Sequence, residues 1–174
     1  MVIQRMCACL LVLVALGTSA ATGAALQRGP VSKGPGTLAA ARKYLEGRWS
    51  LLSFEVFPAG QPPIRVKGEG SLLYDSFGNL DVQIRVDKAT AERLTLAGIP
   101  APAGVVSIRG RTVIDMQALT LTYFLEGQPP FGTPSGPLAL NRPRHWRIEG
   151  NVLTLMTKGD DGQPVSVGRW EKMS

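Results

Sequence analysis

The sequence has very few residues of the kinds that most often carry out catalysis or bind metals. Its 174 residues include one histidine, His145, and two cysteines, Cys7 and Cys9. A multi-histidine metal site therefore cannot be built. The chain also lacks a Gly-x-Ser-x-Gly nucleophile motif, a dinucleotide-binding glycine loop and a Gly-Lys-Ser/Thr phosphate loop. We therefore expect a protein that is not an enzyme, with no metal site and no cofactor.

Long hydrophobic runs are also missing, apart from one near the start. Residues 7–16 are apolar, Arg5 is the only charge before them, and the small residues 17–25 follow. This layout is typical of a secretory signal peptide, and the run is shorter than the roughly 20 residues that span a bilayer. We expect a signal peptide over residues 1–25, cut somewhere between Ala20 and Ala25, and a secreted or periplasmic protein with no integral membrane span after cleavage. An uncleaved anchor is the alternative.

The chain after this segment is basic and free of thiols. Both cysteines lie within the signal, and removal of Arg5 changes the formal charge from +6 to +5. The only dense basic and aromatic cluster, residues 142–147, holds a single tryptophan. One ring is a poor stacking platform, so we expect no nucleic-acid partner. An anionic ligand head group or an envelope polymer that binds this cluster at the rim of the domain is the alternative. Residues 26–36 are rich in Gly and Pro and predict a flexible leader, which leaves 37–174 as one domain.

Strand patterns dominate this domain. A short helix is expected over 37–46, with Thr37 as its N-cap and Gly47 as its stop, and a second short amphipathic helix over 88–97. Alternating apolar residues elsewhere predict strands. Eight strands are expected: 48–57, 69–75, 79–87, 104–109, 111–126, 145–149, 151–158 and 164–172. The fifth is long, and a hairpin at Gln117-Ala118 would make nine, but turn residues are missing there, so eight is the preferred count.

An even number of antiparallel strands can close into an up-and-down barrel. The connections after strands 1, 3 and 5 are long, at 58–68, 88–103 and 127–144, whereas those after strands 2, 4 and 6 are tight, at 76–78, Gly110 and Gly150. The barrel is therefore expected to have one end sealed by turns and one rimmed by loops, where a ligand would enter. Leu94 and Phe131 would lie on a lid formed by two of these loops; the alternative is that the loops have no role. Asp160-Asp161-Gly162 predicts a turn.

The closed end of such a barrel brings the first and last strands together. Gly47 and Trp49 open the first strand, and Arg169 lies in the last. We expect Arg169 to point inward over the Trp49 ring, as a cation over an aromatic face. The alternative is that Arg169 points outward and Trp170 takes the inner place.

Several blocks together resemble the bacterial lipocalin-like domain family. These blocks are Gly47-Arg48-Trp49-Ser50-Leu51-Leu52-Ser53-Phe54-Glu55, Gly70-Ser71-Leu72-Leu73-Tyr74-Asp75, Gly78-Asn79-Leu80-Asp81-Val82-Gln83-Ile84, Gly150-Asn151-Val152-Leu153-Thr154-Leu155 and Arg169-Trp170-Glu171-Lys172. The resemblance spans residues 45–172, with this chain's own long loops between 88 and 144. It implies a calycin-type barrel with a cavity for a small apolar molecule. It supplies no catalytic residues.

The resulting prediction is an exported all-β protein, an eight-stranded antiparallel up-and-down lipocalin-like barrel with a short N-terminal helix. It would bind a small hydrophobic or amphipathic ligand inside the barrel. The runner-up is a cell-envelope protein with a filled barrel that acts through its surface, and a third reading is a barrel enzyme using Tyr123 or Glu55. Ligand identity and oligomeric state stay open. The expected wall residues are Leu51, Val82, Ile84, Ile114, Met116, Tyr123, Leu153 and Leu155.

Overall fold

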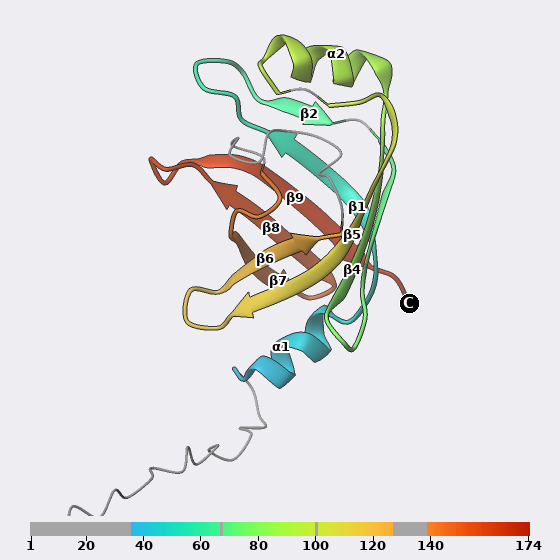
Figure 1. The fold of residues 1–174 in the computed structure, drawn as a ribbon, viewed down its shortest axis with the longest axis vertical. Helices are drawn as coiled ribbons and strands as arrows, with labels where there is room; N and C mark the ends of the chain where they lie inside the picture. The colour runs from blue at the N-terminus through green and yellow to red at the C-terminus, as the bar shows by residue number, and fades with distance from the viewer. Residues whose placement is uncertain (1–35, 67, 100, 127–138) are drawn as a thin grey trace, which may run out of the picture. The chain divides into compact units, whose positions relative to one another are not determined.

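The structure is a computed structural model that describes residues 36–66, 68–99, 101–126 and 139–174 (Figure 1). The expected signal peptide, most of the leader, and Phe131 lie outside the described residues. In chain order the elements are α1 (Leu38–Leu45), β1 (Gly47–Val56), β2 (Ile64–Val66), β3 (Gly70–Tyr74), β4 (Asn79–Val86), α2 (Lys88–Leu96), β5 (Gly104–Asp115), β6 (Thr120–Leu125), β7 (Arg144–Glu149), β8 (Val152–Lys158) and β9 (Pro164–Lys172).

The strands form a closed antiparallel barrel, as predicted. Neighbours pair in the order β1-β3-β4-β5-β6-β7-β8-β9, and β1 pairs again with β9, so eight strands close the ring. The seam runs from Trp49 opposite Lys172 to Val56 opposite Ser166. The short β2 pairs with the far part of β1, outside this ring of eight.

The alternating sequence pattern places the core inside the barrel. In β4 the residues Leu80, Val82, Ile84 and Val86 are buried, whereas Gln83 and Arg85 are exposed. Successive side chains of a strand point to opposite faces, so one face of each strand fills the interior and the other meets water. The same alternation continues around the barrel in β5 and β8.

The turn between β5 and β6 is a correction to the expected strand list. Gly110 was expected to be a tight turn, but β5 runs through it without a break, and the turn is formed by residues 116–119. Gly110 is needed because a Cβ at this position would collide with the Phe124 carbonyl oxygen of β6. The hairpin at Gln117-Ala118 is therefore present, while the count of barrel strands remains eight.

Side-chain capping replaces the missing Gly and Asn in this turn. The Asp115 carboxylate accepts hydrogen bonds from the backbone N–H groups of Gln117, at 2.8 Å, and Ala118, at 2.9 Å. Leu119 adopts a left-handed conformation, with φ of 51°. Such a conformation is uncommon for residues other than glycine. The turn therefore contains none of the Gly, Pro or Asn residues from which turns are usually predicted.

Both expected helices are present and lie at opposite ends of the barrel (Figure 1). Thr37 caps α1 by accepting a hydrogen bond from the Ala40 N–H at 3.2 Å, and Gly47 follows the helix with φ of 123°. Asp87 caps α2, which packs against β2 and buries Ala91 and Leu94. No helix among the described residues is long and apolar enough to cross a membrane.

The base of the barrel differs from expectation in one residue. Trp49 is 1% exposed, and its Nε1 donates a hydrogen bond to the Leu45 carbonyl of α1 at 2.8 Å. The cation over its ring is Lys172, whose Nζ lies 5.1 Å from the ring centroid and donates to the Tyr44 carbonyl. Arg169 is exposed instead, and Trp170 takes the inner place.

The register of the seam explains this correction. Residues directly opposite each other in an antiparallel pair share a face, and Trp49 is opposite Lys172. Arg169 alternates with Trp170 and Lys172 along β9, so it lies on the outer face. The bulge near Leu52 changes the inward positions of β1 only, and the alternation of β9 continues past it.

Candidate ligand-binding site

Inside the barrel lies a partly open cavity of about 60 Å³. Most of its wall is apolar, as expected for the inward positions of barrel strands. A cavity of this size has room for a few water molecules, well below the roughly 300 to 1,000 Å³ of most ligand pockets. The wall is formed by Phe54, Leu72, Val82, Ile84, Ile108, Tyr123, Leu140, Arg144, Leu155, Thr157, Ser166, Gly168 and Trp170.

Arg144 is the charged residue of this wall. It is the first residue of β7 and is 8% exposed. Its Nη1 donates hydrogen bonds to two backbone carbonyls of the segment that enters the strand, Leu140 at 2.7 Å and Arg142 at 2.9 Å. The guanidinium is thereby fixed in position at the cavity wall.

No carboxylate neutralises this guanidinium. The chain has 13 Asp and Glu residues, and all of them lie in the described ranges. The ion pairs of the described residues involve Lys88, Arg109, Arg142 and Arg147, but not Arg144. A buried charge without a partner is costly, so natural proteins seldom keep one unless it is used. Arg144 is therefore the most informative residue of the interior.

Two tyrosines lie beside Arg144. Its Cζ is 4.3 Å from the centroid of the Tyr123 ring, and the Tyr123 hydroxyl is 2.6 Å from the hydroxyl of Tyr74. Both side chains are buried, Tyr74 on β3 and Tyr123 on β6. The cluster thus combines a cation, an aromatic face and two hydroxyls at one place in a mostly apolar interior.

Burial controls the protonation of this cluster. Burial, reinforced by the neighbouring Tyr123, raises the pKa of Tyr74 well above its ordinary value of 10.0. Burial also raises the pKa of Tyr123, although the charge of Arg144 and the hydrogen bond from Tyr74 act against that rise. Burial lowers the pKa of Arg144, but arginine stays protonated in proteins. At neutral pH the cluster therefore carries one positive charge and two neutral hydroxyl groups.

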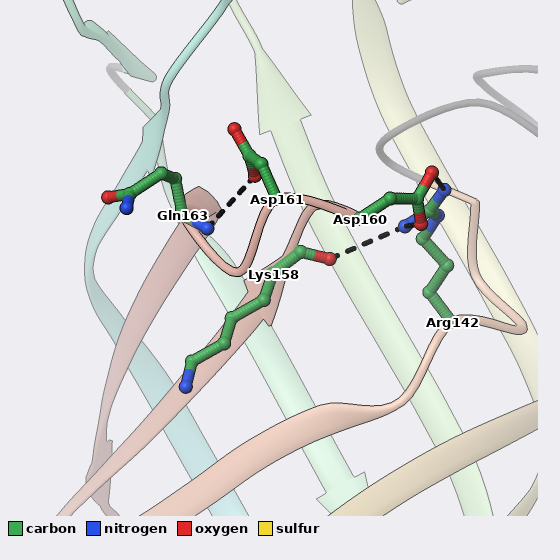
Figure 2. A network of polar contacts seen from close by, with 5 residues as sticks. All are labelled: Arg142, Lys158, Asp160, Asp161 and Gln163. Atoms are coloured by element: carbon green, nitrogen blue, oxygen red, sulfur yellow. Dashed lines mark hydrogen bonds and ion pairs between the residues drawn. The ribbon is translucent and has the colours of Figure 1, made fainter.

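A polar network outside the cavity holds the segment that positions Arg144 (Figure 2). The Arg142 guanidinium forms a two-pronged contact with Asp160, at 3.1 and 3.4 Å, and also donates to the Lys158 carbonyl. Asp160 and Asp161 belong to the turn between β8 and β9, where Asp161 accepts a hydrogen bond from the Gln163 N–H at 2.9 Å. Arg142 thus ties its own backbone, whose carbonyl binds Arg144, to that turn.

The predicted wall residues fall into three groups. Val82, Ile84, Tyr123 and Leu155 line the cavity. Leu153 is buried in the core, and Leu51 and Ile114 pack against it, but none of these three lines the cavity. Leu94, which was expected on the lid, is also buried in the core and does not line the cavity. Met116 lies in the turn after β5 and lines a hollow beside α1. That any of these residues contacts a ligand stays a prediction.

Sequence reasoning missed the polar part of the wall. Residues 142–147 were interpreted as a basic cluster at the rim, although Arg144, Trp146 and Ile148 share one parity along the strand. Thr157 likewise continues the inward series of Leu153 and Leu155. The alternation of inward and outward residues, applied to polar as well as apolar residues, would have placed Arg144 and Thr157 on the inner face.

Two larger hollows lie at the ends of the barrel. One of about 470 Å³ lies between the β1–β2 connection, the end of α2 and the β8–β9 turn, and one of about 330 Å³ lies between α1 and the β5–β6 turn. Neither is lined by a buried charged side chain among the described residues. In the same part of the chain, no group of three or more His, Cys, Asp or Glu residues could hold a metal ion.

Comparisons with known proteins add little to this description. No protein-family model matches the chain, and no curated protein sequence matches it. Among solved structures, a DUF4847 family protein from Bacteroides vulgatus is similar at 12% sequence identity, with 78% of this chain and 99% of that chain covered and a TM-score of 0.42. A likeness this distant does not bear on function.

Proposed function

We propose that this protein is an exported, lipocalin-like binding protein that holds a small amphipathic molecule inside its barrel without transforming it. The observation that carries the proposal is a mostly apolar cavity with a few polar groups in its wall, chiefly Arg144 beside Tyr123. Binding sites for small molecules characteristically combine mostly apolar walls with a few polar groups that fix the orientation of the ligand. The signal-like residues 1–25 support export.

The size of the cavity limits the ligand. A space of about 60 Å³ suits a compact molecule with a short apolar body, not a long lipid chain. A storage protein for bulky lipids would need several times this volume. The proposal therefore concerns a small amphiphile.

Native mass spectrometry of the protein purified from its own host tests this proposal. We expect a bound mass that disappears on denaturation. The variant Ser166→Leu fills the cavity from β9 and should reduce the bound fraction, whereas Val167→Leu enlarges the adjacent residue outside the cavity wall and should leave the fraction unchanged. A mass retained equally by both variants would place the ligand outside the barrel.

A specific observation also favours the second candidate, a filled barrel that acts through its outer surface. The cavity of about 60 Å³ is well below the roughly 300 to 1,000 Å³ of most ligand pockets, so most of the interior is occupied by side chains. A protein purified without any small molecule, but recovered from the host with a stable macromolecular partner, would support this candidate instead.

A further inference from the structure

We infer that the ligand is a small organic acid whose carboxylate pairs with Arg144 inside the barrel. This inference rests on the proposed binding function and specifies its ligand class. It starts from a charge imbalance: a guanidinium that is 8% exposed lines the cavity, and none of the chain's 13 carboxylates forms an ion pair with it. An anionic group entering the cavity would neutralise this charge.

The hydrogen bonds of Arg144 leave two of its N–H groups available for a carboxylate. Its Nη1 makes both of the hydrogen bonds that the side chain forms with described residues, to the Leu140 and Arg142 carbonyls. The N–H groups of Nε and Nη2 have no such partner. They lie on one edge of the planar guanidinium and form a fork that matches the two oxygens of a carboxylate.

The structural contacts of Arg144 leave two of its donors unused. The two carbonyls occupy Nη1, and the Tyr123 ring lies against the guanidinium, with its centroid 4.3 Å from Cζ. Neither contact uses the N–H groups of Nε and Nη2, which are not among the fully buried atoms without a partner and are therefore accessible to a small molecule in the cavity. The fixed Nη1 keeps the guanidinium oriented before the ligand arrives.

The rest of the wall defines the remainder of the ligand. Thr157 on β8 and Ser166 on β9 lie opposite each other and place hydroxyl-bearing side chains in the wall. Leu72, Val82 and Ile108 provide apolar contacts. A short apolar body attached to the carboxylate fits these surroundings and the small volume. A phosphate needs more donors for its larger charge than a single arginine fork provides.

The first experiment uses the unmodified protein, so it does not depend on how a variant folds. Isothermal titration calorimetry would compare butanoate, hexanoate and octanoate with the alcohol and the alkylammonium of the same length, and with inorganic phosphate. We expect at least one acid to bind about tenfold or more tightly than its alcohol, because of the charge-assisted hydrogen bonds to the guanidinium. The ammonium compounds should bind more weakly than either, because the buried charge repels them.

The second experiment removes the guanidinium. Arg144→Gln should lower the affinity for the acid about tenfold or more and leave the affinity for the matched alcohol nearly unchanged. Arg144→Lys, which keeps the charge but loses the planar fork, should recover part of the affinity for the acid. Arg169→Gln removes one exposed positive charge of the same barrel and is the matched control, with no change expected. Circular dichroism and thermal unfolding would establish that each variant is folded.

The possible results separate this inference from the proposed function. Equal binding of acid and alcohol by the unmodified protein, tighter binding of phosphate, or a neutral molecule identified in protein from the host would overturn the carboxylate inference and leave the binding function standing. No bound mass from the host together with no binding of any probe would overturn both. If Arg144→Gln does not fold, the preference of the unmodified protein for acid over alcohol decides the question.

Discussion

Trp49 illustrates how much of the stability of this barrel rests on single side chains. Its indole is almost fully buried at the closed end, donates a hydrogen bond to the last residue of α1 and lies beneath Lys172. The same ring therefore joins the helix, the first strand and the last strand. Its packing and its hydrogen bond act together, because loss of the ring leaves both a cavity and an unpaired Leu45 carbonyl.

Trp49→Ala should lower the free energy of unfolding by about 3 to 5 kcal/mol. The reason is the volume lost from a site that has no access to solvent. Urea denaturation followed by far-ultraviolet circular dichroism would measure the loss. Phe77→Ala, at a side chain that is 79% exposed, is the control and should change stability by about 0.5 kcal/mol or less. A loss below about 1 kcal/mol for Trp49→Ala would contradict the buried position.

Tyr74 should make the protein sensitive to alkali. Burial raises its pKa in the folded state above the ordinary 10.0, so between pH 10 and the folded pKa the unfolded chain loses a proton that the folded chain keeps. The stability should therefore be complete below about pH 10 and fall above it, by at most about 1.4 kcal/mol per pH unit for this proton.

Tyr74→Phe removes this proton and should make the fall with pH shallower, although Tyr123 contributes a similar effect. Urea denaturation at intervals between about pH 8 and 11.5, monitored by tryptophan fluorescence, would measure both curves. Parallel curves for the two proteins would show that Tyr74 does not keep its proton in the folded state.

At the scale of single residues, part of the apolar wall was predictable and the charged part was not. Val82 and Ile84 were identified because alternation with polar residues marks an inward face. Arg144 obeys the same alternation, but arginine is usually exposed, so its position within a basic cluster suggested the rim. Lys172 was missed for another reason, because the residue opposite Trp49 depends on the pairing register of β1 and β9, which the alternation within one strand does not give.

At the scale of elements, the starts of the helices were predictable from their capping residues, whereas the position of the β5–β6 turn was not. The helices α1 and α2 begin after Thr37 and Asp87, whose side chains accept hydrogen bonds from the first turn, and such caps can be read from sequence. The turn after β5 depends on Asp115 and on the left-handed Leu119, a combination with no strong sequence signature. Gly110 gave a misleading signal, because it serves close packing of strands and not a turn.

Gly110→Ala should therefore destabilise the barrel by about 1 to 3 kcal/mol, as an overpacked site does. The added methyl group would meet the backbone of Phe124 and Leu125, which cannot move away as a flexible side chain could. Thermal and urea unfolding would measure the effect. Ser107→Ala in the same strand, at an exposed position, is the control and should be nearly neutral. An equally neutral Gly110→Ala would show that β5 and β6 are further apart than described here.

At the scale of the whole molecule, closure followed from the even strand count, and the difference between the two ends followed from the lengths of the connections. The closure and the difference between the ends hold although the β5–β6 turn lies elsewhere than expected. Moving one tight turn along the chain leaves the number of barrel strands at eight. The cavity could not be predicted, because its volume depends on how inward side chains such as Phe54 and Trp170 pack against one another.

Closure itself predicts a pattern of hydrogen exchange. The Met173 N–H donates to the Arg48 carbonyl, and the Phe57 N–H donates to the Val165 carbonyl, so these hydrogen bonds join the two ends of the seam. If β1 and β9 close the barrel in solution, both amides should exchange about as slowly as those of the β4–β5 pair, although Met173 is next to the C-terminal residue. NMR-detected exchange would measure the rates, with the amide of the exposed Asp161 in the β8–β9 turn, which donates to no described residue, as a fast-exchanging reference. Fast exchange at Phe57 and Met173, combined with slow exchange in β4 and β5, would mean that the sheet is open at this seam and that the interior does not enclose a ligand.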